Sequence, residues 1–176
     1  MSLMLLIGGA RSGKSELAVR LARHQTAPVT VIATGEAGDE EMTARIAQHR
    51  RDRPTEWVTI EEPLDLVKAL AQVPGGDCLI VDCLTLWTAN MLGAAGAAQA
   101  EARAARAAAI AAGRPGRTIV VTNEVGLGLV PDHPLGRDYR DLLGRVNAIW
   151  AGAAERAYLL VAGRALRLEP LPELAP

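Results

Sequence analysis

The chain has 176 residues, a formal net charge of −1 and 49% hydrophobic residues. This length suits one domain with a real core, so we expect residues 1–176 to form a single domain. The balanced charge argues against a generic nucleic-acid binder, and no apolar run reaches the roughly 20 residues that a membrane span requires.

Apolar runs alternate with helical patterns along the chain. In chain order we expect strand 3–9, helix 14–24, strand 29–34, helix 39–50, an extended piece 56–62, helix 64–72, strand 78–83, a helical stretch 85–112, strand 118–124, helix 135–155, strand 157–163 and an edge segment 165–169. Asp39 is a plausible N-cap, and Pro54 stops the helix that follows it. The tail 170–176 is expected to be loose.

Strands that are apolar throughout and separated by helices indicate an α/β fold, a mostly parallel sheet with helices on both faces. The alanine-rich stretch 93–113 has good helix propensity but weak patterning, so we expect a helix in solvent there. Cys78 and Cys83 look like small core residues of a reducing compartment rather than a disulfide pair. The first apolar run leads straight into glycines, so we expect no secretory leader and a soluble, cytoplasmic protein.

The segment GGARSGKS matches the pattern G-x-x-x-x-G-K-[ST] of a phosphate-binding loop (P-loop), between a predicted strand and a predicted helix. Backbone N–H groups of such a loop surround phosphate oxygens, and glycines permit its tight path. Lys14 would act catalytically on the outer phosphates, and Ser15 would bind Mg²⁺. The expected nucleotide-binding positions are Gly8, Gly9, Ala10, Arg11, Ser12, Gly13, Lys14 and Ser15. The alternative is a chance match in a glycine-rich turn.

Asp82 ends the apolar strand CLIVD and could approach the Mg²⁺ held by Ser15. The alternative is an acidic residue at a strand end without a metal role. We therefore expect Ser15 and Asp82 to be the metal ligands.

Met42, Ile46 and His49 are spaced by four and three residues, so they share one helical face. A lone histidine on such a face is more often a packed core residue, but arginines surround this one. Positive charge disfavours imidazolium, so we expect a neutral His49 that can act as a nucleophile.

The arginines around His49 could hold a polyphosphate through forked hydrogen bonds. The candidates are Arg50, Arg51 and Arg53. The alternative is that Arg45, Arg50 and Arg51 face water or pair with nearby acids, which are Glu40, Glu41 and Glu56.

Several segments together resemble the bifunctional adenosylcobinamide kinase / adenosylcobinamide-phosphate guanylyltransferase family of cobalamin biosynthesis. They are GGARSGKS, IAT (32–34), EMTARIAQHRRDRPTEWVTIEEP (41–63), IVDCLTLWTANML (80–92), VTNEVGLGLVP (121–131) and RDYRDLLGRVN (137–147). The resemblance implies a RecA-like P-loop NTPase fold and a homotrimer. It implies two reactions: phosphorylation of adenosylcobinamide with ATP or GTP, and transfer of GMP from GTP to the resulting phosphate. In the family a covalent guanylyl-histidine forms at the position of His49.

The resemblance also implies further nucleotide-binding positions, which are Thr34, Arg50, Arg51, Asp52, Arg53, Glu61 and Asp82. A carboxylate at Glu61 could accept two hydrogen bonds from guanine and so select GTP. Asp82 stands where some relatives carry glutamate, and either acid can serve Mg²⁺. Asn123 and Glu124 should lie at the carboxyl edge of the sheet, where they could position substrate or activate its hydroxyl.

Two other functions remain open at this point. One is a P-loop small-molecule kinase in which His49 is structural, and the other is a nucleotide-dependent switch or ATPase that transfers nothing.

Overall fold

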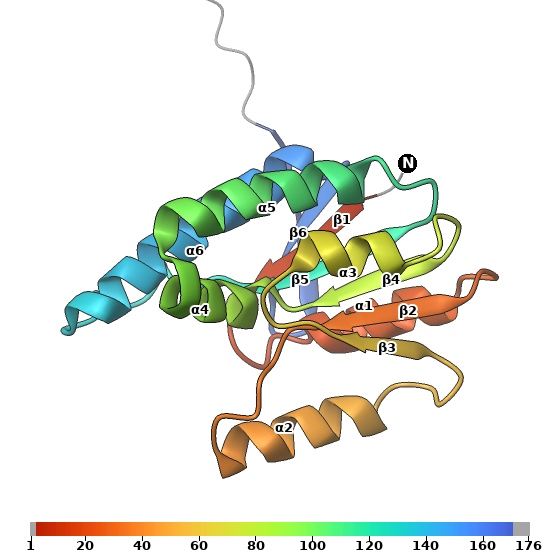
Figure 1. Cartoon of the computed structure of the whole chain (residues 1–176), viewed down its shortest axis with the longest axis horizontal. Coiled ribbons are helices and arrows are strands. Elements are labelled where there is room, and N and C mark those ends of the chain that lie inside the picture. Colours follow the sequence, from red (N-terminus) through yellow and green to blue (C-terminus); the bar gives the residue numbers. More distant parts are fainter. Residues whose placement is uncertain (1–2, 171–176) are drawn as a thin grey trace, which may run out of the picture.

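The computed structural model describes residues 3–170, so all but the first residue of the tail predicted to be loose lies outside the described residues. A seven-stranded sheet forms its centre (Figure 1). The elements are β1 (Leu3–Gly8), α1 (Lys14–Arg23), β2 (Val29–Ala33), α2 (Glu40–Arg51), β3 (Val58–Glu61), α3 (Leu66–Gln72), β4 (Cys78–Asp82), α4 (Leu84–Ala95), α5 (Ala97–Ala112), β5 (Thr118–Asn123), α6 (Pro134–Ala153), β6 (Arg156–Val161) and β7 (Arg164–Leu168).

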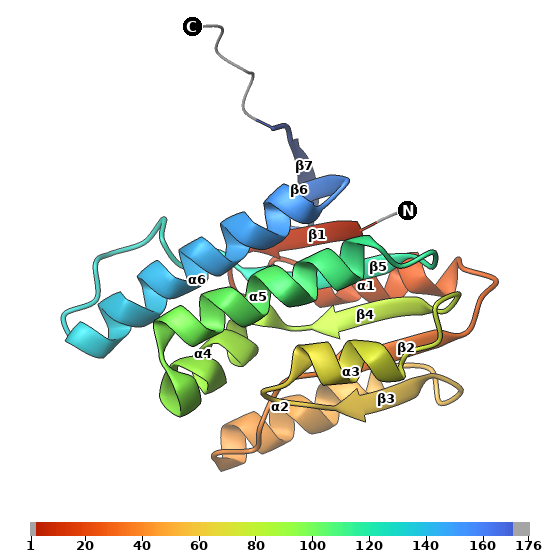
Figure 2. The same cartoon turned by 45° about the horizontal axis from the view of Figure 1, so that its top comes forward.

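The sheet is mostly parallel, as predicted. Its strand order is β3-β2-β4-β5-β1-β6-β7, and only β7 runs antiparallel to its neighbour. Helices α3, α5 and α6 lie over one face, and α1 lies under the other (Figure 2). Successive strand residues therefore enter opposite cores: Leu5 and Val120 contact the larger helical layer, whereas Leu6 and Ile119 pack with α1.

The predicted helix 85–112 is two helices, because the chain breaks at Gly96, whose φ of +79° favours glycine. The expectation of a helix in the alanine-rich stretch is confirmed, but the expectation that solvent surrounds it is wrong. One face of α5 is fully buried in the larger core, and it consists of Ala100, Ala104, Ala107, Ala108 and Ala111. These positions have helical spacing, but a run of alanines lacks the polar contrast that would reveal which face is buried.

We expect Ala104→Leu to lower the free energy of unfolding by about 1–3 kcal/mol, because the three extra heavy atoms of leucine cannot fit into a close-packed layer. Ala104 is buried, whereas Ala105 is exposed on the same helix. Ala105→Leu is the matched control and should change the free energy of unfolding by less than about 0.5 kcal/mol. Urea unfolding followed by circular dichroism measures both. Equal effects would contradict a buried alanine face.

Strand order sets the geometry of the carboxyl edge. β5 lies between β1 and β4, and Asn123 at its end is in register with Gly8 at the end of β1. The ends of β1 and β4 are therefore two strand spacings apart, about 9.5 Å. A Cβ at Gly8 would collide with the carbonyl oxygen of Leu160, so only glycine fits where β1 turns into the following loop.

Two further expectations concern the chain as a whole. Cys78 and Cys83 are both free thiols, and Cys78 is buried in the core, as predicted. Within residues 3–170 no helix is both long and apolar enough to cross a membrane.

Candidate functional site

A cavity of about 750 Å³ opens at the carboxyl edge of the sheet. The P-loop lines one side of it, and α2 lines another through Met42, Ile46 and His49. The predicted shared face of these three residues is therefore confirmed. The ends of β4 and β5 contribute Asp82 and Asn123.

The P-loop has the geometry of an anion-binding site. Gly13 has a φ of +95° and no side chain caps the first turn of α1, so backbone N–H groups of that turn are left for a ligand. Lys14 is buried, and its Nζ donates to the Gly9 carbonyl at 2.6 Å and contacts Ser12 Oγ at 3.3 Å. Burial lowers the pKa of Lys14, against the opposing charges of Cys83 and Asp82.

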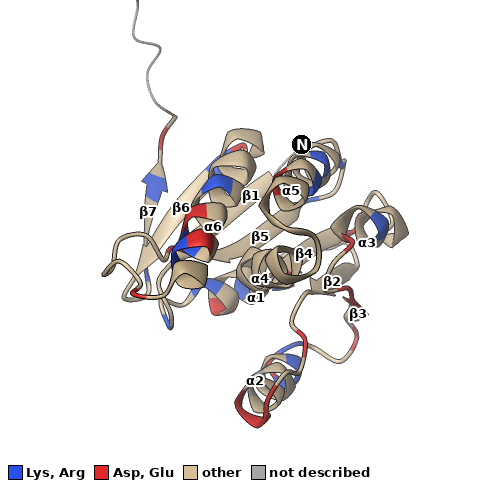
Figure 3. Ribbon diagram, turned by 60° about the vertical axis from the view of Figure 1, so that its left-hand side comes forward, with Lys and Arg blue, Asp and Glu red and all other residues tan. Residues whose placement is uncertain are grey.

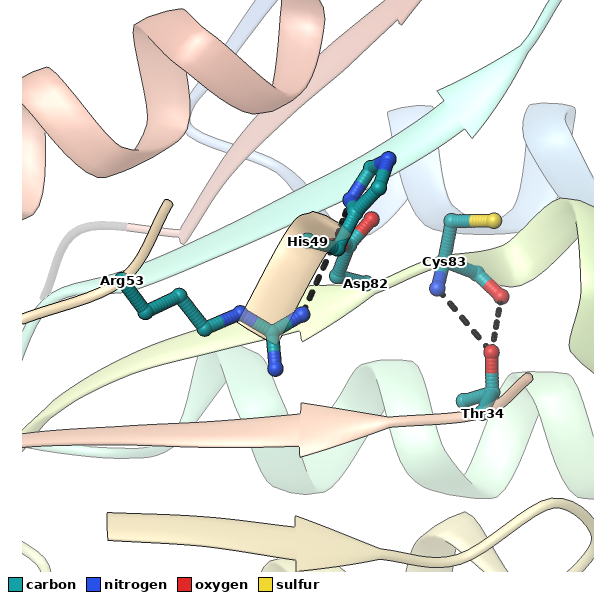
Figure 4. Close-up of polar contacts among 5 residues, drawn as sticks. All are labelled: Thr34, His49, Arg53, Asp82 and Cys83. Carbon is teal, nitrogen blue, oxygen red and sulfur yellow. Dashed lines mark hydrogen bonds and ion pairs between the residues drawn. The ribbon is translucent and has the colours of Figure 1, made fainter. Parts of the chain in front are cut away.

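Asp82 joins α2 to the sheet (Figure 4). His49 Nδ1 lies 3.3 Å from Asp82 Oδ2, and Arg53 donates to the same oxygen at 3.0 Å. Burial opposes ionisation of Asp82, but the hydrogen bonds and charges of His49 and Arg53 hold the pKa of the carboxyl below its usual value. The three side chains thus form one ionic cluster at the edge of the cavity.

The expectation that nearby arginines lower the pKa of His49 overall is wrong. The hydrogen bond to Asp82 raises the pKa of His49 above its ordinary value, and it outweighs burial and the charge of Arg53, which act in the opposite direction. The other arginines have partners of their own: Arg50 pairs with Glu61, and Arg51 donates to Gln48. A carboxylate that contacts the ring changes the pKa of the histidine more than positive charges that lie farther away.

Helix α2 is held mainly by these polar contacts. It begins at the predicted N-cap, where Asp39 accepts a hydrogen bond from the Met42 N–H at 2.7 Å. Glu40 and Glu41 lie in its first turn, and three basic residues, His49, Arg50 and Arg51, lie in its last, as the helix dipole favours (Figure 3). It stands apart from the helical layers on the two faces, near β3 (Figure 1), and contributes no side chain to either described core cluster.

Thr34 is placed differently from the expectation for a nucleotide-binding residue. It is fully buried, and its hydroxyl donates to the Cys83 carbonyl at 2.6 Å and accepts from the Cys83 N–H at 2.9 Å (Figure 4). In this arrangement Thr34 fixes the chain next to Asp82 and does not line the cavity.

The structure brings most of the predicted site residues to one cavity. The lining includes Ala10, Arg11, Ser12, Gly13, Lys14, Ser15, His49, Arg50, Arg53, Glu61 and Asp82. The predicted residues outside the lining are Gly8, Gly9, Thr34, Arg51 and Asp52. Asp52 instead follows the end of α2, where its carboxylate accepts from Gln48 at 2.7 Å.

Sequence reasoning missed two residues that fix the end of β5. Thr85 lines the cavity, and its Oγ1 accepts from the Asn123 N–H at 2.7 Å. Asn147, on α6, donates to the Asn123 carbonyl at 3.0 Å. No local pattern reveals the role of either residue, because each is a small polar residue inside a helix and its partner lies 24 or more residues away.

Ser15 and Asp82 both face the cavity, so the residues present fit a magnesium site of the P-loop kind. Mg²⁺ in such sites takes only one or two protein ligands and fills its remaining positions with phosphate oxygens and water. Within the described residues no group of three or more His, Cys, Asp or Glu side chains forms a metal site built from protein alone.

A family model described as "Cobinamide kinase / cobinamide phosphate guanyltransferase" matches residues 4–168. The chain is 44% identical over 169 residues to the bifunctional adenosylcobalamin biosynthesis protein CobP of Pseudomonas aeruginosa, covering 96% of this chain and 98% of that protein. It is 36% identical over 181 residues to the bifunctional adenosylcobalamin biosynthesis protein CobU of Escherichia coli, covering 95% and 99% of the two chains.

Solved structures share the fold. A prototypical ATPase of a bacterial type III secretion system superposes with a TM-score of 0.53 at 13% identity, over 91% of this chain and 52% of that chain. The RadB recombinase superposes with a TM-score of 0.51 at 14% identity, over 90% and 73%. These similarities confirm the predicted RecA-like P-loop NTPase fold.

Proposed function

Since the chain belongs to the cobinamide kinase / cobinamide phosphate guanyltransferase family, we propose that the cavity at the carboxyl edge of the sheet serves both reactions and that His49 carries the guanylyl group from GTP to the adenosylcobinamide phosphate. A single observation supports this most: His49 lines the same cavity as Lys14 and Ser15 of the P-loop. A nucleotide whose phosphates lie in that loop is then within reach of the imidazole.

In the kinase step the P-loop holds the triphosphate of ATP or GTP through its backbone N–H groups. Lys14 neutralises charge that develops on the outer phosphates while the adenosylcobinamide hydroxyl attacks the γ-phosphorus. Ser15 and Asp82 would hold Mg²⁺, which would supply further neutralisation of the phosphate oxygens.

In the guanylyl step His49 attacks the α-phosphorus of GTP and pyrophosphate leaves. The adenosylcobinamide phosphate then attacks the same phosphorus, the phosphorus–nitrogen bond breaks, and adenosylcobinamide-GDP forms. Arg50 and Arg53 line the cavity near His49, which supports a role for them in binding phosphate oxygens.

Labelling with GTP tests the proposal directly. Protein incubated with α-³²P-GTP and Mg²⁺ should retain label on a denaturing gel, and the label should be labile to acid and stable to base, as a phosphoramidate is. Transfer of phosphate to cobinamide without protein labelling would favour the plain kinase, and nucleotide hydrolysis alone would favour the switch or ATPase.

We further expect Glu61→Gln to reduce selectivity for GTP over ATP in protein labelling by about tenfold, because a carboxylate can accept two hydrogen bonds from guanine and an amide cannot. Glu61 lines the cavity beside Arg50. Glu62→Gln is the matched control: Glu62 is not part of the lining, and its Oε1 accepts from the Leu64 and Asp65 N–H groups. Competition between the two nucleotides measures the ratio, and an unchanged ratio in Glu61→Gln would contradict the assignment.

At the end of β5, we assign the role of positioning the substrate or activating its hydroxyl to Asn123 rather than to Glu124. Asn123 lines the cavity, and it ends the strand that lies between β1, which leads into the P-loop, and β4, which ends at Asp82. The carboxylate of Glu124 does not line the cavity, because it accepts hydrogen bonds from the Gly126 and Leu127 N–H groups of its own loop.

We therefore expect Asn123→Ala to lower kcat of phosphate transfer to cobinamide by about 10- to 100-fold, since it removes an amide that can hold the γ-phosphate or the attacking hydroxyl. Glu124→Gln keeps the oxygen that accepts the loop N–H groups and should change kcat less than about threefold. Steady-state kinetics with γ-³²P-ATP compares the two variants. A larger loss in Glu124→Gln would reverse the assignment.

We also propose that the protein is cytoplasmic and assembles as a homotrimer. Large apolar side chains are exposed around the loop before α6, which supports a contact with another molecule there. They include Leu127, Leu129, Val130 and Leu135.

A further inference from the structure

The two nitrogens of the His49 ring have different surroundings. Nδ1 is committed to Asp82 Oδ2, and the second ring nitrogen points away from that carboxylate (Figure 4). The His49 side chain is 41% exposed, whereas the side chains of Asp82 and Arg53 are 13% and 9% exposed. One edge of the ring thus faces a protected carboxylate, and the other is open to a ligand.

Asp82 is itself well fixed. It ends β4, which lies between β2 and β5 inside the sheet. The next residue, Cys83, exchanges two hydrogen bonds with buried Thr34. Arg53 donates to the same Asp82 oxygen that faces His49, so this oxygen is held in position.

We propose that Asp82 is a positioning residue for the guanylyl step, which holds the Nδ1–H of His49 so that the phosphorus–nitrogen bond forms at Nε2. In a neutral ring with its proton on Nδ1, the free electron pair is on Nε2. This pair forms the bond to the α-phosphorus while the bond from that phosphorus to the pyrophosphate oxygen breaks.

The proton stays on Nδ1 throughout, and the positive charge that the ring gains is balanced by the Asp82 carboxylate. When the cobinamide phosphate displaces the imidazole, the electron pair returns to Nε2 and the ring is again neutral. In Ser-His-Asp triads, a buried aspartate likewise orients the catalytic histidine and stabilises its charged form.

This inference rests on the proposed function, and the two can fail separately. Wild-type protein labelled with α-³²P-GTP is oxidised with periodate and subjected to β-elimination, which removes the nucleoside and leaves phosphate on the histidine. Alkaline digestion and chromatography then separate Nε2-phosphohistidine from Nδ1-phosphohistidine. We expect only the Nε2 isomer. The Nδ1 isomer would overturn the inference but leave the guanylyl-histidine intact, whereas unlabelled protein would overturn the proposed function.

Asp82→Ala tests the positioning role. Loss of rate alone is ambiguous, because Asp82 also faces the expected magnesium site. The decisive readout is the protonated nitrogen of the neutral ring, read from two-bond ¹H–¹⁵N correlation spectra of the unliganded protein and assigned with His49→Ala. We expect Nδ1–H in the wild type and a shift towards Nε2–H in Asp82→Ala. An Nε2–H ring in the wild type, or identical spectra of folded Asp82→Ala and wild type, would overturn the inference.

Discussion

His49→Ala should abolish protein labelling by α-³²P-GTP and lower formation of adenosylcobinamide-GDP by about 10³-fold or more, because no other group can accept the guanylyl moiety in its place. Phosphate transfer from ATP to cobinamide should persist within about threefold, since His49 touches the γ-phosphate in neither proposed step. One substitution is thus expected to separate the two reactions of one cavity.

The controls for this experiment are the other two histidines of the chain. His24 ends α1 and His133 caps α6, and both are exposed. His24→Ala and His133→Ala should label like the wild type. Persistent label in His49→Ala, or a parallel loss of both reactions in a folded variant, would contradict the assignment of His49 as the nucleophile.

Lys14→Ala should lower both reactions by about 10²–10³-fold, the usual effect of losing one charged donor from a preorganised phosphate site. Both steps need the triphosphate in the same loop, so one lysine serves both. In the unliganded protein Lys14 donates to the Gly9 carbonyl and contacts Ser12, and a phosphate oxygen would replace these partners.

Lys68→Ala is the matched control, because Lys68 is exposed on α3 and lies outside the cavity. Single-turnover labelling and steady-state phosphate transfer measure the two activities. The thermal midpoint should stay close to that of the wild type in both variants. If Lys14→Ala impaired only one reaction, the two steps would use different phosphate sites.

The sequence predicted the P-loop, the start of α2 and the alternation of strands and helices, because the signals for these features are local. The P-loop spans eight consecutive residues, the N-cap at Asp39 lies three residues from its partner N–H, and the apolar strands alternate with helices. Each of these features depends on neighbours in the chain, so the residue types alone carry the information.

What the sequence could not predict depends on contacts between distant segments. His49 and Asp82 are 33 residues apart, so neither signals that a carboxylate contacts the ring and reverses the expected direction of the pKa shift. Thr34 and Cys83 are 49 residues apart, and only the fold shows that the threonine hydroxyl is occupied. The buried face of α5 was hidden for a different reason, since alanine occurs on both its faces.

The contacts that hold α2 predict which segment of the chain unfolds locally first. Helix α2 contacts the rest of the protein chiefly through the ion pairs of His49, Arg50 and, just beyond its end, Arg53. The sheet, in contrast, packs against a hydrophobic core on each face. Local unfolding is easiest where little apolar area must be exposed, so the backbone amides of this helix should exchange hydrogen faster than those of β1 or β4. A nucleotide joined to His49 would add contacts to the least protected segment, and each turnover would alternately tighten and loosen it.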